Sequence, residues 1–274
     1  MADPYIGKTL SNSRFTIDDT SLTDYFTGLN LDADPNGHIP AMVATGVDNA
    51  YFAEIAFPYQ IGHLWMRQEW ELRQPLQPNY AYHVSGEITD IYDKRDRQVV
   101  KYRVDLSNDD EELVIRTYHH QSFLRERISG ESVELRDPTK KPGARKFVVP
   151  DGKRFGGLET TITKGMCGIF FHGNANYHTD DDAAKELGFQ RVVVGGRMTM
   201  AYAGTVLESY FGDEWATSGK LDLKFTNPCW CDDLVTVHGV ELAEQSSRNR
   251  RQAFLWMQKP DESIVYVAEA SVAV

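Results

Sequence analysis

The stretch RMTMAYAGTVLESYF, residues 197–211, decides the fold that we expect for this chain. It is long enough to form a helix, and its residues are apolar or small on almost every side. A helix without a polar face must be buried all round. The rest of this half of the chain is therefore expected to wrap around it.

Four strand-like segments follow this stretch, and apolar and polar residues alternate in each of them: residues 220–225, 234–242, 251–259 and 263–272. Such alternation, with turn residues between the segments, predicts an antiparallel sheet with one face in water. A sheet that curls around the apolar helix buries it with few elements, an arrangement known as the hot-dog fold. Upstream, Asp180 and the acidic residues after it predict a short helix that ends at Gly188, with Asp180 as its N-cap.

The first half of the chain repeats this order. A helix is expected within residues 41–57, and strand-like segments follow it. When the first half is shifted forward by 153 residues, Leu72 falls on Phe225 and Gly86 falls on Gly239. Similarity at one fixed offset indicates a duplicated unit. We therefore predict an α+β fold, a double hot dog whose two curled antiparallel sheets each wrap around a central helix and pair edge to edge.

Residues 126–157 are rich in charge, Gly and Pro and lack a sustained apolar period, which is typical of a linker. They divide the chain into an N-terminal hot-dog half, residues 1–125, and a C-terminal half, residues 158–274. Each half is large enough to bury a core of its own.

Composition excludes several classes of protein. Hydrophobic residues make up 41% and charged residues 25% of the chain, as in ordinary globular proteins. The formal net charge of −11 argues against a nucleic-acid partner. No apolar run approaches the roughly 18 residues that span a bilayer, and no signal peptide is visible. Three cysteines, Cys167, Cys229 and Cys231, are too few for a disulfide framework and lack zinc spacing, so we expect a cytoplasmic protein without a metal.

The segment FFHGNANYHTDDDAAKELGFQRVVVGGRMTM, residues 170–200, resembles the active-site region of the MaoC-like dehydratases, the hydratase-2 group of hot-dog proteins. The matching features are His178 with Asp180 two residues later, the Ala-containing helix after them, a valine-rich segment, and the step Gly195–Gly196 into the central helix. One branch of this family is built as a double hot dog.

The resemblance implies that water is added to, or removed from, the 2,3 double bond of an acyl-CoA thioester. His178 is then the acid/base, a role that suits an imidazole. The backbone N–H of Gly196 is the donor to the thioester carbonyl, with Gly195 as second choice, because a helix N-terminus offers free N–H groups and a positive partial charge. Coenzyme A enters as part of the substrate, and no other cofactor is expected.

The chain departs from the family pattern where an aspartate is expected five positions before the histidine, since residue 173 is Gly. With a one-residue shortening, Asn174 takes that position and is expected to hold the water or the imidazole. Asn176 and Tyr177 then line the substrate. Alternatively, an acid from elsewhere completes the site, or the chemistry has changed.

Other candidates are weaker. Arg191 and Arg197 flank the glycine step and are expected to bind substrate phosphates. Gly196 has a purely packing interpretation as well. In the pair His119–His120, alternation predicts that at most one side chain is in the core. The N-terminal half lacks a matching acid/base set and is expected to shape the pocket for the acyl tail.

Three hypotheses stay open at this stage: an acyl-CoA hydratase or dehydratase, a hot-dog thioesterase, and a non-catalytic acyl-thioester-binding subunit of a heteromeric hydratase. A homodimer is possible because hot-dog units usually pair. The acyl group is not identified by the sequence.

Overall fold

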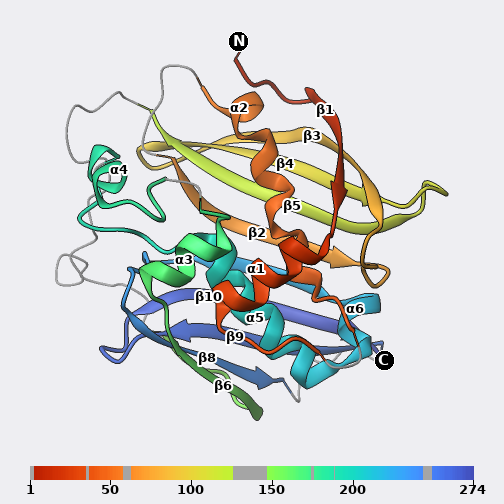
Figure 1. Ribbon diagram of the computed structural model, residues 1–274, viewed down its shortest axis with the longest axis vertical. Helices are drawn as coiled ribbons and strands as arrows, with labels where there is room; N and C mark the ends of the chain where they lie inside the picture. The colour runs from red at the N-terminus through yellow and green to blue at the C-terminus, as the bar shows by residue number, and fades with distance from the viewer. Residues whose placement is uncertain are drawn as a thin grey trace.

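The computed structural model describes residues 3–34, 37–57, 63–125, 147–173, 176–187, 189–242 and 249–274. In this part of the chain, ten strands form one antiparallel sheet in the order β1-β3-β4-β5-β2-β7-β10-β9-β8-β6 (Figure 1). Along this order, the first five strands come from the first half of the chain and the last five come from the second half.

The strands are β1 (Thr9–Thr16), β2 (Leu64–Leu72), β3 (Ala81–Lys94), β4 (Arg97–Ser107), β5 (Leu113–Leu124), β6 (Lys153–Thr161), β7 (Lys220–Phe225), β8 (Leu234–Glu241), β9 (Arg250–Gln258) and β10 (Ile264–Ala273). The helices are α1 (Asp19–Leu29), α2 (Phe52–Ile55), α3 (Lys164–Phe170), α4 (Asp181–Glu186), α5 (Gly196–Phe211) and α6 (Asp213–Ser218), with two 3-10 helices, η1 (Ala41–Gly46) and η2 (Asp48–Tyr51). None of these helices combines the length and apolarity needed to cross a membrane.

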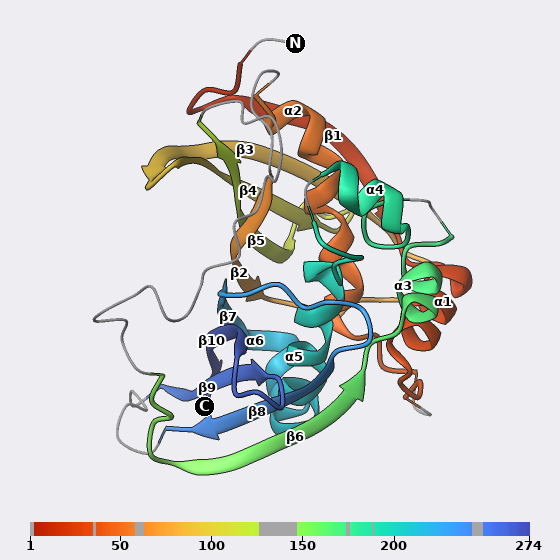
Figure 2. The same ribbon diagram turned by 90° about the vertical axis from the view of Figure 1, so that its left-hand side faces the viewer.

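Helix α5 lies on the concave side of the curved sheet, as the apolar stretch predicts (Figure 2). Its buried residues lie on several faces of the helix and include Met198, Met200, Tyr202, Ala203 and Leu207. The four strand-like segments of this half are β7, β8, β9 and β10, with ends within one residue of those expected. Burial of α5 therefore dictates the curvature of this half.

The two halves meet between β2 and β7, which pair antiparallel with Glu69 opposite Asp222. These two residues are also related by the 153-residue offset found in the sequence. The strand order on one side of this pair mirrors that on the other, so a pseudo-twofold axis passes through it. The facing carboxylates are balanced by Arg67, which forms two hydrogen bonds with Asp222 at 2.6 and 2.7 Å.

The prediction of a helix within residues 41–57 is wrong as a single helix, because the structure divides this helical segment into η1, η2 and the four-residue α2. Asp48 is fully buried, and its backbone carbonyl accepts a hydrogen bond from the Tyr102 hydroxyl. Its carboxylate accepts hydrogen bonds from Gln68 at 2.5 Å and from Thr117 at 2.8 Å. These bonds to the sheet hold the segment in a tighter, interrupted helical path.

The expectation for His119–His120 is also wrong, since the two side chains are only 1% and 3% exposed. They do point to opposite faces, but His120 is covered on the outer face by Tyr92 and Glu69, which lie 3.0 and 2.9 Å from its ring nitrogens. Cross-strand polar partners therefore bury a residue that the alternation pattern assigns to solvent.

Several elements lack a sequence prediction, namely α1, α3, α6, β1 and β6. Helix α1 has a signal in hindsight, since Asp18 and Ser21 form a capping box at its start. Strand β6 is an edge strand in which every residue is exposed or half-buried, and it begins at Lys153, inside the predicted linker. Most of that linker, residues 126–146, lies outside the described part of the chain.

Helix α5 also joins the two halves. A side chain at Gly204 would meet Met42 of η1 at 2.2 Å, so the glycine permits the close crossing of these helices. The Glu208 Oε1 atom accepts a hydrogen bond of 2.9 Å from the backbone N–H of Ala41, the first residue of η1. Burial raises the pKa of Glu208 to about 7, because the charged carboxylate is poorly solvated at this crossing.

We expect the E208Q variant to be more stable than the wild type at pH 8 and equally stable at pH 4.5. A carboxyl whose pKa is raised in the folded state contributes stability at low pH, and this stability is lost as the pH rises through about 7. Glutamine keeps the acceptor for Ala41 without the charge. The expected gain at pH 8 is about 1–3 kcal/mol, since one pKa unit corresponds to about 1.4 kcal/mol and the group is partly solvated.

Urea unfolding at the two pH values measures this gain. The E186Q variant, which changes an exposed carboxylate of α4, is the matched control and should show no gain that depends on pH. Equal stability of E208Q and wild type at both pH values would contradict the assigned burial cost.

Candidate functional site

A turn before α4 positions His178. The Asn176 Oδ1 atom accepts a hydrogen bond of 2.8 Å from the backbone N–H of His178. Asp180 then caps α4, because its carboxylate accepts from the N–H groups of Asp182 and Ala183 at 3.0 and 2.9 Å. The predicted N-cap is therefore confirmed. Asn176 holds the turn with its side-chain oxygen, so its observed contact is with the protein.

The imidazole of His178 is half-buried and has a defined orientation. Its Nδ1–H donates a hydrogen bond of 2.8 Å to the carbonyl of Val193, which can only accept. In the neutral ring, Nε2 is then the unprotonated nitrogen, and it has no partner among the described residues. The ring stacks on Phe171 with centroids 5.0 Å apart and an interplanar angle of 15°.

Burial lowers the pKa of His178 to about 4, and the hydrogen bond to Val193 opposes this effect only in part. The charges that add to the lowering are those of His63 and Arg197. No carboxylate of the described residues has a resolved effect on this pKa. At neutral pH, His178 is therefore an uncharged ring with a free lone pair on Nε2.

The glycine step lies at the N-terminus of α5, beside this ring. A side chain at Gly195 would meet the Phe171 ring at 2.4 Å, and one at Gly196 would meet Trp65 at 2.8 Å and Phe225 at 3.1 Å. Close packing alone therefore explains why both positions are glycine. The N–H of Gly196, at the first position of α5, has no partner among the described residues, so the group that the resemblance assigns to the carbonyl is free.

Tyr177 links His178 to a second imidazole that the sequence did not indicate. The Tyr177 ring lies 3.9 Å from that of His178 and 5.5 Å from that of His63, which directly precedes β2 in the N-terminal half. Burial lowers the pKa of His63 and raises that of Tyr177 to about 12. Both halves of the chain therefore contribute to this site, which only the tertiary contacts reveal.

The two arginines beside the glycine step have different surroundings. Arg191 is exposed, pairs with Asp233 at 2.9 Å and lies over the Trp230 ring. Arg197 is half-buried, with its guanidinium 5.3 Å from the centre of the Phe170 ring and 5.7 Å from that of Phe171. Arg191 thus already has a carboxylate partner, whereas Arg197 is packed between two aromatic rings, and the binding of substrate phosphates by either residue stays a prediction.

Asn174 lies outside the described residues, so its predicted role stays a prediction. Within the described residues, no group of three or more His, Cys, Asp or Glu side chains is arranged to hold a metal. The three cysteines are free and buried, with the sulfurs of Cys167 and Cys231 in contact at 3.6 Å.

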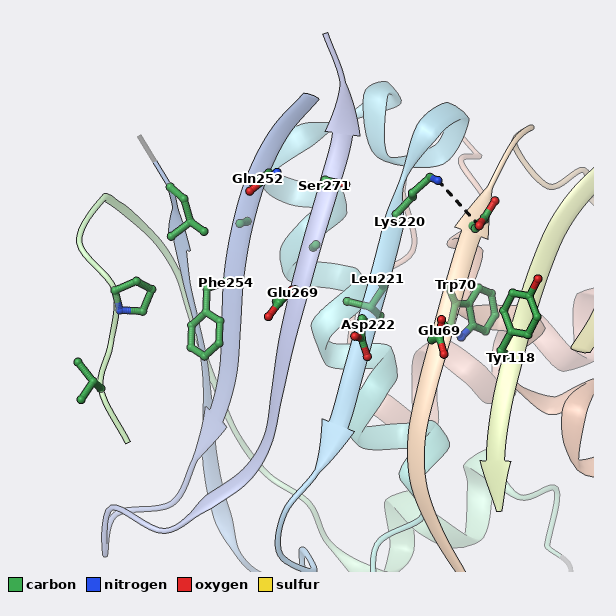
Figure 3. Close-up of a pocket in the computed structure, with 16 residues that line it drawn as sticks. Glu69, Trp70, Tyr118, Lys220, Leu221, Asp222, Gln252, Phe254, Glu269 and Ser271 are labelled. Atoms are coloured by element: carbon green, nitrogen blue, oxygen red, sulfur yellow. Dashed lines mark ion pairs between the residues drawn. The ribbon is translucent and has the colours of Figure 1, made fainter. Parts of the chain in front are cut away.

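A hollow on the outer face of the sheet is separate from this site. Figure 3 shows it over the β2–β7 boundary, with the helices on the other side of the sheet and with Lys220 paired to Glu71 at 3.8 Å. Charged side chains that already have ion-pair partners line it, among them Lys220, which pairs with Glu71, and Asp222, which pairs with Arg67. This hollow offers no acid/base pair beside a helix terminus.

Residues 159–254 match the family model of the MaoC like domain, so this part of the chain is a MaoC-like domain, as the resemblance predicted. Among curated protein sequences, none matches the chain.

Several solved structures share the fold. HtdX from Mycobacterium tuberculosis superposes with a TM-score of 0.67 at 16% identity, covering 96% of this chain and 98% of that one. A MaoC-like dehydratase from Phytophthora capsici gives a TM-score of 0.71 at 14% identity, with 98% and 95% covered. A conserved M. tuberculosis protein described as having a double hotdog fold gives 0.63 at 10% identity, with 99% and 97% covered. The predicted double hot-dog fold is confirmed.

We expect the G195A variant to be destabilised by about 1–3 kcal/mol, the usual range for overpacking a filled site. The backbone φ of −62° suits alanine, so the cost comes from the contact of the new methyl group with Phe171. Because Phe171 stacks on His178, the ring of His178 is expected to move as well. Urea unfolding measures the cost, and NMR of the imidazole reports the movement.

The matched control is G168A, where a new methyl group meets no atom within 4 Å. This position lies inside α3, so alanine should be neutral or stabilising. If G195A and G168A had the same stability, Phe171 would not be packed against Gly195 as described.

Proposed function

We propose that this chain is a hydratase or dehydratase that acts on the 2,3 double bond of an acyl-CoA thioester. One observation carries the proposal: the Nδ1–H of His178 is held by Val193, which leaves Nε2 free, and the ring stacks on Phe171, which also fills the space beside Gly195 at the start of α5. A general base and a backbone donor for a developing oxyanion are what this reaction requires. The fold shared with MaoC-like dehydratases supports the proposal.

In the proposed hydration, the oxygen of a water attacks C3 of the enoyl thioester while Nε2 of His178 takes a proton from that water. The electron pair of the double bond moves to C2 and the thioester oxygen, where the N–H of Gly196 donates to the developing charge. The imidazolium then returns its proton to C2. One H and one OH are added, and the reverse sequence removes water.

The low pKa of His178 acts in opposite directions on the two proton transfers, because it makes the neutral ring a weaker base and the protonated ring a stronger acid. A ring with a pKa of about 4 stays neutral at pH 7 and is ready to accept a proton. Its protonated form is then a strong acid, which favours delivery of the proton to C2. The scheme needs no carboxylate beside the imidazole, and none of the described residues supplies one.

We expect H178A to lose at least about a hundredfold in kcat/KM for hydration, the lower end of what general acid/base catalysis contributes. A panel of enoyl-CoA thioesters, followed by mass spectrometry, first identifies a substrate. The control is H172A, because His172 is exposed and its ring pairs with Asp24 at 2.6 Å. Unchanged turnover in H178A would remove His178 from the mechanism.

The same assay separates the alternative functions. Release of free coenzyme A without a hydroxyacyl product would identify a thioesterase. Tight acyl-CoA binding without turnover, restored by a second chain, would identify a subunit of a heteromeric enzyme.

We expect N174D to change the hydration rate by at least about tenfold, roughly 1.4 kcal/mol of barrier. The substitution replaces a neutral amide by a carboxylate at the position where the family pattern has its aspartate, and only a carboxylate can accept a proton there. Steady-state kinetics of the variant measure the change. A rate within twofold of the wild type would make Asn174 a loop residue without a role in the reaction.

A further inference from the structure

Arg197, the second residue of α5, has a guanidinium group that forms no hydrogen bond or ion pair with any described residue. Its Nε is shut off from solvent and makes no hydrogen bond. The faces of the Phe170 and Phe171 rings lie 5.3 and 5.7 Å from its Cζ atom. A guanidinium has five N–H donors, and a donor such as the Nε–H of Arg197, which is shielded from water and has no acceptor, costs free energy.

The nearest buried acid does not satisfy this group. Asp48 raises the pKa of Arg197, but its two carboxylate oxygens already accept hydrogen bonds, Oδ1 from Thr117 and Oδ2 from Gln68. Asp48 therefore offsets part of the positive charge of Arg197 from a distance and forms no hydrogen bond with it. Burial lowers the pKa of Arg197 to about 10, so the side chain is still a cation at neutral pH.

The local packing leaves room for the guanidinium. A side chain at Gly46 of η1 would meet its Nη2 atom at 2.6 Å, so this glycine makes the space that Arg197 occupies. The neighbouring Thr45 is fully buried, and its hydroxyl also lacks a partner. Gly46 thus borders one unsatisfied polar group, the guanidinium, and Thr45 contains another, its hydroxyl. Buried polar groups without hydrogen bonds are rare in native proteins.

The guanidinium lies beside the proposed reaction site. The Phe171 ring contacts three of its groups at once, since it stacks on His178, borders Gly195 and lies under Arg197. An anion bound to Arg197 would therefore lie close to the acyl carbons. The phosphates of coenzyme A, by contrast, are separated from the thioester by the whole pantetheine arm.

We propose that Arg197 binds a carboxylate carried by the acyl group, so that the substrate is the CoA thioester of a dicarboxylic acid. The inference rests on the proposed function and names the substrate class of the same site. The planar guanidinium matches a carboxylate with two parallel hydrogen bonds. An acyl chain made only of hydrocarbon would bury the same cation without a partner.

The test compares two ligands that differ only at the end of the acyl chain. Succinyl-CoA and butyryl-CoA are saturated and of equal chain length, so neither is hydrated and the coenzyme A portion cancels in the comparison. Calorimetry on the full chain gives the dissociation constant of each. We expect the wild type to bind succinyl-CoA at least tenfold more tightly, and this ratio to fall to about one in R197M.

The matched control is R73M, which removes an exposed arginine that pairs with Glu71 at 2.7 Å. It should keep the ratio of the wild type. Equal affinity of the wild type for the two ligands overturns the proposal, and this outcome stands even if R197M does not fold.

Measuring hydration distinguishes the hydratase proposal from the proposal of a dicarboxylic substrate. Fumaryl-CoA and crotonyl-CoA are the matching unsaturated pair. Hydration of crotonyl-CoA without preference for succinyl-CoA in binding overturns the substrate class and leaves the hydratase proposal intact. Preference for succinyl-CoA without hydration of either enoyl thioester supports the carboxylate site and overturns the hydratase proposal.

Discussion

The enclosure of α5 by the curved sheet is the constraint on which the rest of the structure depends. A helix with buried residues on most of its faces needs cover on all sides, and an antiparallel sheet supplies this cover by curling. The enclosure fixes the position of the helix N-terminus, where the free N–H of Gly196 and the guanidinium of Arg197 are found. The site is therefore a consequence of the way the core is packed.

Phe171 transmits this packing to the imidazole. Its ring is 9% exposed and fills the space that a side chain at Gly195 would need, while its face stacks on His178. The same burial that fixes the ring of His178 also lowers its pKa, because the charged form loses its hydration. Orientation and protonation state thus have one physical cause.

The two halves share the same strand order but differ in the segment that the sheet encloses. In the C-terminal half, α5 is one continuous helix, and the N–H of Gly196 at its first position has no partner among the described residues. In the N-terminal half, the carboxylate of Asp48 is bonded to Gln68 and Thr117 within the core, and the corresponding segment is broken into short helical turns.

The sequence by itself determined the fold class, because an all-apolar helix and period-two strands leave few ways to bury the helix. It also determined the duplication, whose offset pairs Glu69 with Asp222 in the β2–β7 contact. The motif singled out His178 and the glycine step, and the acidic turn identified Asp180 as a cap. These features are local or periodic, so they are visible along the chain.

Only the tertiary structure decided the rest. His63 reaches the site through Tyr177 from the other half of the chain, and Arg197 lies beneath the surface because Gly46 leaves space for it. Both histidines of His119–His120 are buried because partners on neighbouring strands cover the outer one. The edge strand β6 and the interrupted helix of residues 41–57 also depend on such partners. Burial and pairing between distant segments set these properties, and no local pattern encodes them.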